Sequence, residues 1–330
     1  MLVKVSVEGV SPRADISQFL GNRDNRLGEI TFAVNDSRIQ QADVWIIIES
    51  PEPYDLECFA GRSVFVAAES MWGPGREAES PSRQQYLNQF DAIYTYQDLY
   101  WPEVHFAPPF LPWMINSNHG SSIFSPHDRD VRFFRNLRYL PKSRPLSVIC
   151  SAKSYTEGHR LRLRFVEALA AELGGDMDWY GNGHVSVPEK WNAIAPYRFH
   201  LVIENQAAFG VITEKLIDSF LGLAHPIYYG APDVTRYFPD EAVTCINIRD
   251  FASSLETIRS MISRPSTTDL NPDLIEAKDV VLDEWNLFER LGRVAASEHR
   301  LPRRSQVTTL RLPPRERPAW KRMAARLRSK

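Results

Sequence analysis

The stretch from residue 197 to residue 230, YRFHLVIENQAAFGVITEKLIDSFLGLAHPIYYG, predicts a strand, a loop, a helix and a second strand. Residues 199–203 form a short apolar run, which is typical of a strand buried on both faces. Thr213 can cap a helix whose apolar residues then recur at helical spacing. We therefore expect one repeating unit of a parallel sheet, with its polar residues in the turns.

The first turn of this helix would contain Glu214 and Lys215. A lysine at a helix N-terminus opposes the helix dipole, so we expect an anion nearby, held by backbone N–H groups and by the ammonium. A glutamate beside it can accept hydrogen bonds from ribose hydroxyls. Together these features indicate a nucleotide-sugar diphosphate site at the carboxyl end of a parallel sheet. The alternative is a solvated Glu-Lys pair, since charged first turns are common.

The whole stretch resembles the donor-binding signature of the alpha-1,3-fucosyltransferases of glycosyltransferase family 10. That signature reads Tyr-x-Phe, an apolar strand, Glu-Asn, a short loop, Val-Thr-Glu-Lys, a helix and Pro-Ile-x-x-Gly. The matching residues are Tyr197, Phe199, Glu204, Asn205, Ile212, Thr213, Glu214, Lys215, Pro226, Ile227 and Gly230. The chain departs from the pattern at Val211, where the family usually has an aromatic residue.

The resemblance implies an inverting transfer of L-fucose from GDP-fucose to a hydroxyl of a glycan acceptor, by an enzyme of bacterial type. It assigns the ribose to Glu214 and the diphosphate to Lys215, in the helix that Thr213 caps. Glu204 and Asn205 would line the sugar side of the cleft. We expect no cofactor and no metal, because positive side chains can stabilise the departing GDP.

A second segment of the resemblance is SAKSYTEGHRLRLRFVEALAAELG, which follows an apolar strand at 146–150. A small-polar loop, Gly-x-Arg and a helix are similar to the family's pattern, which implies that Arg160 contacts the donor pyrophosphate. A fixed guanidinium suits two phosphate oxygens. For Arg162 and Arg164 we expect a solvated helix face.

The first 140 residues alternate strand-like runs with turns that are rich in aromatic and acidic residues. Such turns suit a sugar acceptor, although Trp72 and Trp101 could equally be core residues. Inverting transfer requires a carboxylate that takes the proton of the acceptor hydroxyl. In the stretch DAIYTYQDL, Asp98 occupies the position of the family's proposed base, where glutamate is usual. Glu69 is the second candidate, and a helix or turn cap is the alternative role for Asp98.

The chain has 330 residues, with 43% hydrophobic residues, 24% charged residues and a formal net charge of -2. This composition predicts a globular protein without a general nucleic-acid footprint. Its three cysteines, Cys58, Cys150 and Cys245, are far apart and suggest reduced thiols. A cluster of histidines and aspartates at 119–130 matches no ligand spacing, so a solvated linker is preferred over a metal site.

Both ends of the chain bear on localisation. MLVKVSVEGV predicts a first strand and lacks signal-peptide features, and no stretch reaches the roughly 20 apolar residues of a membrane span. The segment 300–330 is strongly basic, with Glu316 as its single acidic residue, and 320–330 predicts an amphipathic helix. We expect a cytoplasmic protein that can bind peripherally to the inner face of the cytoplasmic membrane, with an anionic membrane surface as partner and no nucleic acid.

The expected fold class is α/β, GT-B: two facing Rossmann-like domains with parallel sheets and a cleft between them. We expect an acceptor-binding domain at 1–140, a GDP-sugar donor-binding domain at 141–295 and a basic amphipathic tail at 296–330. The acceptor would be an oligosaccharide or a lipid-linked glycan. The alternatives are a GT-B transferase that uses another nucleotide sugar, and a carbohydrate-binding module without catalysis.

Overall fold

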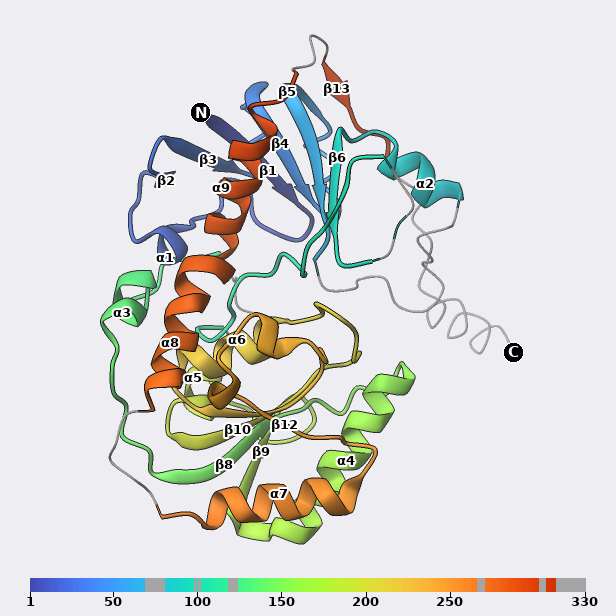
Figure 1. The fold of residues 1–330 in the computed structure, drawn as a ribbon. Coiled ribbons are helices and arrows are strands. Elements are labelled where there is room, and N and C mark those ends of the chain that lie inside the picture. The colour runs from blue at the N-terminus through green and yellow to red at the C-terminus, as the bar shows by residue number, and fades with distance from the viewer. Residues whose placement is uncertain are drawn as a thin grey trace. The chain divides into compact units, whose positions relative to one another are not determined.

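The computed structural model describes residues 1–68, 81–97, 99, 102–117, 124–265, 271–302 and 307–312 (Figure 1). The chain forms two compact units. Unit 1 comprises Met1–Arg13, Phe32–Ala107 and Ala295–Lys330, and unit 2 comprises Ala14–Thr31 and Pro108–Val294. Residues 313–330, the part of the basic tail that contains the amphipathic helix predicted at 320–330, lie outside the described residues and are called the basic segment below.

The first sheet has a parallel centre, as the alternating apolar runs of the N-terminal half predict. Its strand order is β2-β3-β1-β4-β5-β6-β7, with β13 paired to β5, and the pairs from β1 to β7 are parallel. Helix α2 and the residues after it pack on this sheet through Tyr86, Leu87 and Phe90. The elements are β1 (Leu2–Val7), β2 (Arg26–Leu27), β3 (Ile30–Val34), β4 (Gln41–Ile48), β5 (Glu57–Val66), α2 (Pro81–Leu87), β6 (Ala92–Thr95), β7 (Val104–Phe106) and β13 (Thr308–Thr309).

The second sheet lies wholly in unit 2 and is parallel throughout, in the order β12-β11-β10-β8-β9. From β8 the chain passes to β9 on one side, and it then continues at β10 on the other side of β8. The carboxyl ends of β8 and β10 therefore meet at a topological switch point, where ligands bind in open α/β sheets. The strands are β8 (Arg144–Ile149), β9 (Met177–Tyr180), β10 (Tyr197–Ile203), β11 (His225–Tyr229) and β12 (Thr244–Cys245).

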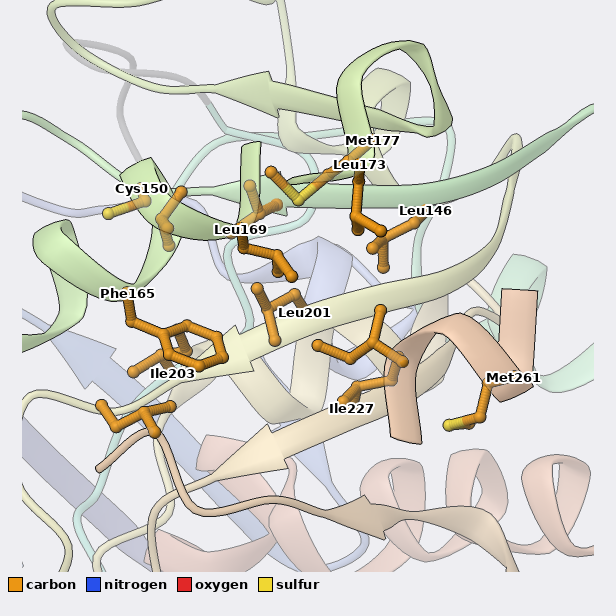
Figure 2. Packing of buried hydrophobic residues seen from close by; sticks show 14 residues of the cluster. Leu146, Cys150, Phe165, Leu169, Leu173, Met177, Leu201, Ile203, Ile227 and Met261 are labelled. Atoms are coloured by element: carbon orange, nitrogen blue, oxygen red, sulfur yellow. The ribbon is translucent and has the colours of Figure 1, made fainter. Parts of the chain in front are cut away.

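Helices cover both faces of this second sheet. On one face, α4 (Glu157–Leu173) and α7 (Phe251–Ser263) bury side chains such as Phe165 and Ile258 against Leu146, Leu201 and Ile203 (Figure 2). On the other face lie α5 (Lys190–Ile194) and α6 (Glu214–Leu221) (Figure 1). This packing buries β10 on both faces, as its sequence predicts.

The segment 274–293 is rich in acidic and aromatic residues, and its sequence predicts a single long helix, which the structure interrupts. The structure has α8 (Pro272–Val280), a π-helical turn η4 (Val281–Trp285) and α9 (Leu287–Glu298). Asn286, which is buried, ends the π-turn: its amide donates to the Phe19 carbonyl, and its Oδ1 accepts from Phe288 N. The remaining short elements are α1 (Ser17–Leu20), α3 (Val131–Asn136), η1 (Gly174–Asp176), η2 (Val234–Arg236) and η3 (Asp240–Ala242).

The division of the chain differs from the expected boundary at residue 140, because the segment 108–136 belongs to unit 2. Two buried cations hold it there. Arg290 donates to the carbonyls of Pro108 and Pro109, and Lys278 donates to the Phe134 carbonyl. Among the described helices, none has the length and apolar composition that crossing a bilayer requires.

Candidate active site

Glu204 connects the end of β10 to the start of α6. Its side chain is buried, with 2% exposure, and its backbone N donates to the Tyr229 carbonyl at 2.8 Å. The carboxylate accepts from Thr213 N at 3.0 Å, from the Thr213 hydroxyl at 2.8 Å and from Lys215 Nζ at 3.3 Å. One buried carboxylate thus satisfies a backbone donor, a hydroxyl and a cation at the carboxyl end of the sheet.

Thr213 is the N-cap of α6, as the sequence predicts. Its backbone is extended, and its hydroxyl accepts from Lys215 N at 3.4 Å and from Lys215 Nζ at 2.9 Å.

At Gly230, which follows β11, any larger side chain would clash with its neighbours. A Cβ at this position would lie 2.2 Å from Tyr228 Oη and 2.6 Å from Glu204 Cγ. The last glycine of the signature therefore leaves room for its buried glutamate.

Glu214 lies in the first turn of α6 with only 7% exposure. Its Oε1 is 3.5 Å from Lys215 Nζ and 3.7 Å from Lys190 Nζ. Burial by itself would raise the pKa of Glu214, but Lys215 and Lys190 together lower that pKa to about 2. The second oxygen, Oε2, is buried and has no hydrogen-bond partner among the described residues. Within the described residues it is therefore a buried acceptor that no donor satisfies.

The anions nearest to Lys215 belong to the chain itself. Its ammonium contacts the carboxylates of Glu204 and Glu214, and 20% of its side chain is exposed. The sequence predicts an anion beside this lysine, and in the structure these two carboxylates are such anions. The exposed part of the ammonium remains accessible to a further anion.

Asn205, which follows Glu204, is held by helix α4. Its Oδ1 accepts from Arg162 Nη1 at 2.7 Å. Arg162 is 6% exposed, and its Nε has no partner among the described residues. At Gly158, in the first turn of α4, a Cβ would lie 1.9 Å from the Asn205 carbonyl oxygen. The N-termini of α4 and α6 thus both reach the loop that follows β10.

The expectation that Arg162 lies on a solvated face is wrong. Arg162 precedes Phe165 by three positions and Val166 by four, and all three side chains are buried. This i, i+3, i+4 spacing places them on one face of a helix. The sequence therefore contained a signal for the burial of Arg162.

The structure places Arg160 outside this cluster. It is exposed, and its Nη1 donates to the Ser154 carbonyl at 3.2 Å in the loop before α4. Its neighbour His159 lies in the first turn of α4, which Thr156 caps, and His159 Nδ1 is 2.6 Å from Thr156 Oγ1. Burial and nearby cations, Arg162 first among them, lower the pKa of His159 to about 4, so the ring is neutral at pH 7.

Sequence reasoning missed Lys190 and Asp218. Lys190 Nζ donates to Asp218 Oδ2 at 2.9 Å, and Asp218 Oδ1 accepts from Met114 N at 2.7 Å. Asp218 follows Glu214 by four positions on α6, so the two carboxylates share a helix face. That spacing was visible in the sequence, but the lysine between them comes from a different element.

The two candidate bases, Asp98 and Glu69, lie outside the described residues, as do Trp72 and Trp101. Glu49 contacts Ala68, the last described residue before Glu69. It is 3% exposed and has a φ of 58°. Its carboxylate accepts from Ala68 N at 2.8 Å.

In the cluster at 119–130, His127 and Asp130 form local contacts. His127 lies 3.1 Å from Glu189, and Asp130 caps α3.

Comparison with solved structures supports the fold class. The chain superposes on a structure described as trehalose-6-phosphate from E. coli bound with UDP-2-fluoro glucose, with a TM-score of 0.52 at 9% identity, over 92% of this chain and 100% of the other. An alpha1,3-fucosyltransferase solved with GDP-fucose matches with a TM-score of 0.44 at 16% identity, over 100% of this chain and 89% of the other. The class is thus an α/β protein with parallel sheets and the fold of the GT-B glycosyltransferases.

Sequence comparison is more specific for unit 2. Residues 142–263 match the model of the glycosyltransferase family 10 (fucosyltransferase) C-terminal domain. A curated relative, the alpha-(1,3)-fucosyltransferase FucT of Helicobacter pylori, is 34% identical over 73 residues, which are 22% of this chain and 15% of that protein. The match to the family 10 domain therefore covers residues 142–263 of this chain, which lie in unit 2.

Proposed function

We propose that the protein is an inverting, alpha-1,3-type fucosyltransferase, which moves L-fucose from GDP-fucose to a hydroxyl of a glycan acceptor. The observation that carries the proposal is the cluster of Glu204, Thr213, Glu214 and Lys215 at the switch point of the unit 2 sheet. This cluster lies inside the segment that matches the family domain.

The diphosphate of the donor would bind where two helix N-termini meet. Gly158, in the first turn of α4, lies against the Asn205 carbonyl, α6 begins after the same loop, and helix N-termini favour anions. Lys215 would supply one cation and the buried Arg162 a second, whose Nε has no partner within the described part of the chain. Arg160 stays a candidate for an outer contact, because its exposed guanidinium lies on the same turn of α4.

The ribose would bind to Glu214, whose Oε2 is a buried acceptor without a partner among the described residues. Asn205 and Glu204 would lie on the sugar side. In the reaction, Asp98 or Glu69 would take the proton of the acceptor hydroxyl while its oxygen attacks the anomeric carbon. The bond to GDP breaks in the same displacement, through an oxocarbenium-like state, and the cations stabilise the departing diphosphate.

The remaining partners are part of the same proposal. The acceptor would be an oligosaccharide or a lipid-linked glycan, bound by unit 1. The basic segment 313–330 would contact an anionic membrane surface, on the inner face of a bacterial cytoplasmic membrane.

Calorimetric titration tests the donor site. Purified protein is titrated with GDP, GDP-fucose, GDP-mannose and UDP-galactose, and the titrations are repeated with Lys215→Ala. We expect the guanosine ligands alone to bind, and the variant to weaken their binding by about 10- to 100-fold, as expected for loss of a charged hydrogen bond. Arg164→Ala is the matched control, because Arg164 is an exposed cation on α4.

Two results would contradict the proposal. Binding of UDP-galactose in place of the guanosine ligands would favour a GT-B transferase that uses another nucleotide sugar. Binding of GDP-fucose without product from any glycan acceptor would favour a carbohydrate-binding module.

A further inference from the structure

Lys190 lies next to Glu214 of the proposed donor site, and the sequence signature assigns no role to it. We propose that Lys190 is a positioning residue, which keeps the Glu214 carboxylate charged and aimed at the nucleotide ribose when Lys215 turns to the diphosphate. The inference rests on the proposed function and adds a residue to its machinery.

The position of Lys190 is fixed at both ends. Its backbone N, at the start of α5, donates to the Ser117 carbonyl at 3.0 Å. Its ammonium lies 2.9 Å from Asp218 Oδ2 and 3.7 Å from Glu214 Oε1. Asp218 is in turn anchored by Met114 N, which donates to its Oδ1 at 2.7 Å. The ammonium is therefore held between two carboxylates of α6.

Glu214 needs this second cation. Its side chain is nearly fully buried, and burial disfavours the charged form of a carboxylate. In the unliganded chain Lys215 also compensates the charge, but Lys215 is shared with Glu204. A diphosphate at Lys215 would draw that ammonium further away. Lys190 would then be the cation that keeps Glu214 ionised.

The charge of the Glu214 carboxylate matters because of its second oxygen, Oε2. Glu214 Oε2 has no donor among the described residues, and an ionised carboxylate accepts hydrogen bonds from the two ribose hydroxyls more strongly than a neutral acid does. Without Lys190, the carboxyl group would be less often charged and less firmly oriented. The variant would therefore lose affinity for the ribose hydroxyls and keep its contacts with the guanine and the phosphates.

The test compares GDP with 2′,3′-dideoxy-GDP, which lacks both ribose hydroxyls. Calorimetry should show that wild type prefers GDP by about 10- to 100-fold, the range expected for hydrogen bonds to a charged group. In Lys190→Met, the preference should fall below about threefold, while affinity for dideoxy-GDP changes little. Lys190→Arg should restore most of the preference, because a guanidinium keeps the charge.

The matched control is Lys142→Met. Lys142 is a second largely buried lysine of unit 2, whose ammonium binds the Ala195 and Gly222 carbonyls at the ends of α5 and α6. Its removal should lower stability and keep the preference for GDP. A double variant provides the second measurement: in a Glu214→Gln background, Lys190→Met should have no further effect on the preference, because Lys190 acts through Glu214.

The outcomes separate the inference from the proposed function. An unchanged preference in a folded Lys190→Met, or an equal loss of affinity for both nucleotides, would overturn the role of Lys190 and leave the donor site standing. If wild type binds neither nucleotide, the proposed function and this inference fall together.

Discussion

Arg160 and Arg162 lie two positions apart on α4, and their side chains meet different surroundings. Arg160 is exposed and donates to its own loop at Ser154, whereas Arg162 is buried and donates to Asn205. We expect the buried guanidinium, whose Nε has no partner among the residues that the structure describes, to hold an anion better, because its geometry is fixed before the ligand arrives.

The two arginines can be ranked by kinetics. We expect Arg162→Lys to lower kcat/KM for GDP-fucose by about 10- to 100-fold, because lysine cannot form the forked contacts of a guanidinium. Arg160→Ala should cost less than about tenfold, and the exposed Arg164→Ala should have no effect. The measurement is product formation at saturating acceptor. The opposite ranking would make Arg160 the principal diphosphate contact, as the sequence pattern suggests.

For single residues, the sequence predicted the features that depend on neighbours within a few positions along the chain. The helix cap by Thr213 is confirmed, and so is the placement of Glu214 and Lys215 in the first turn. The pairing of Lys190 with Asp218 spans 28 residues, and it depends on how α5 packs beside α6. No local pattern specifies such a contact. The burial of Arg162 was readable from the helical spacing of its apolar neighbours.

At the scale of elements, strands β8 and β10 bring a polar pair into the interior. His200 and Ser147 are neighbours in the parallel register, and His200 Nδ1 lies 2.8 Å from Ser147 Oγ. Burial first, and then the positive charge of Lys190, lower the pKa of His200 to about 3. The folded state therefore holds this ring neutral, whereas the unfolded chain protonates it near pH 6.5.

Acid should therefore destabilise this pair of strands. Above pH 6.5 the ring is neutral in both states, and His200 adds no pH dependence. As pH falls from 6.5 towards 3, only the unfolded state takes up the proton, so stability falls by up to about 1.4 kcal/mol per pH unit. Urea unfolding at pH 7.0, 6.0 and 5.0 checks this. His200→Gln should show a shallower loss than wild type, and parallel curves would contradict the assignment.

The element boundaries show where sequence patterns fail. The sequence predicts a strand at 177–180 and a helix at 251–263, and the structure has both. The continuous helix near 274–293 is absent, because the amide of the buried Asn286 donates a hydrogen bond to the Phe19 carbonyl, outside the helix. A polar residue in an amphipathic pattern does not reveal whether its partner is solvent or a distant carbonyl.

At the scale of the whole molecule, the sequence predicted two α/β halves with parallel sheets, and the structure has them. It did not predict that residues 14–31 belong to unit 2. Their place there depends on contacts such as that of Asn286 with Phe19, which are 267 residues apart. Contacts of this separation leave no periodic trace in the sequence.

The C-terminal end offers a last prediction, because the described part of it is integrated into unit 1. Thr308 pairs with Cys58 of β5, Leu310 is 2% exposed, and Gln89 exchanges two hydrogen bonds with the backbone of Arg311. A chain that ends at Leu312 keeps these contacts and loses the basic segment. A chain that ends at residue 302 loses both.

The two truncations should therefore separate membrane contact from stability. The shorter deletion should abolish sedimentation with anionic phospholipid vesicles and leave GDP affinity and the unfolding midpoint unchanged. The longer deletion should also cost roughly 2 to 3 kcal/mol in unit 1, because burial of Leu310 and the strand hydrogen bonds are lost. If both truncations unfold alike, β13 adds no stability. If the chain ending at Leu312 still sediments with vesicles, a part of the chain outside the basic segment makes the membrane contact.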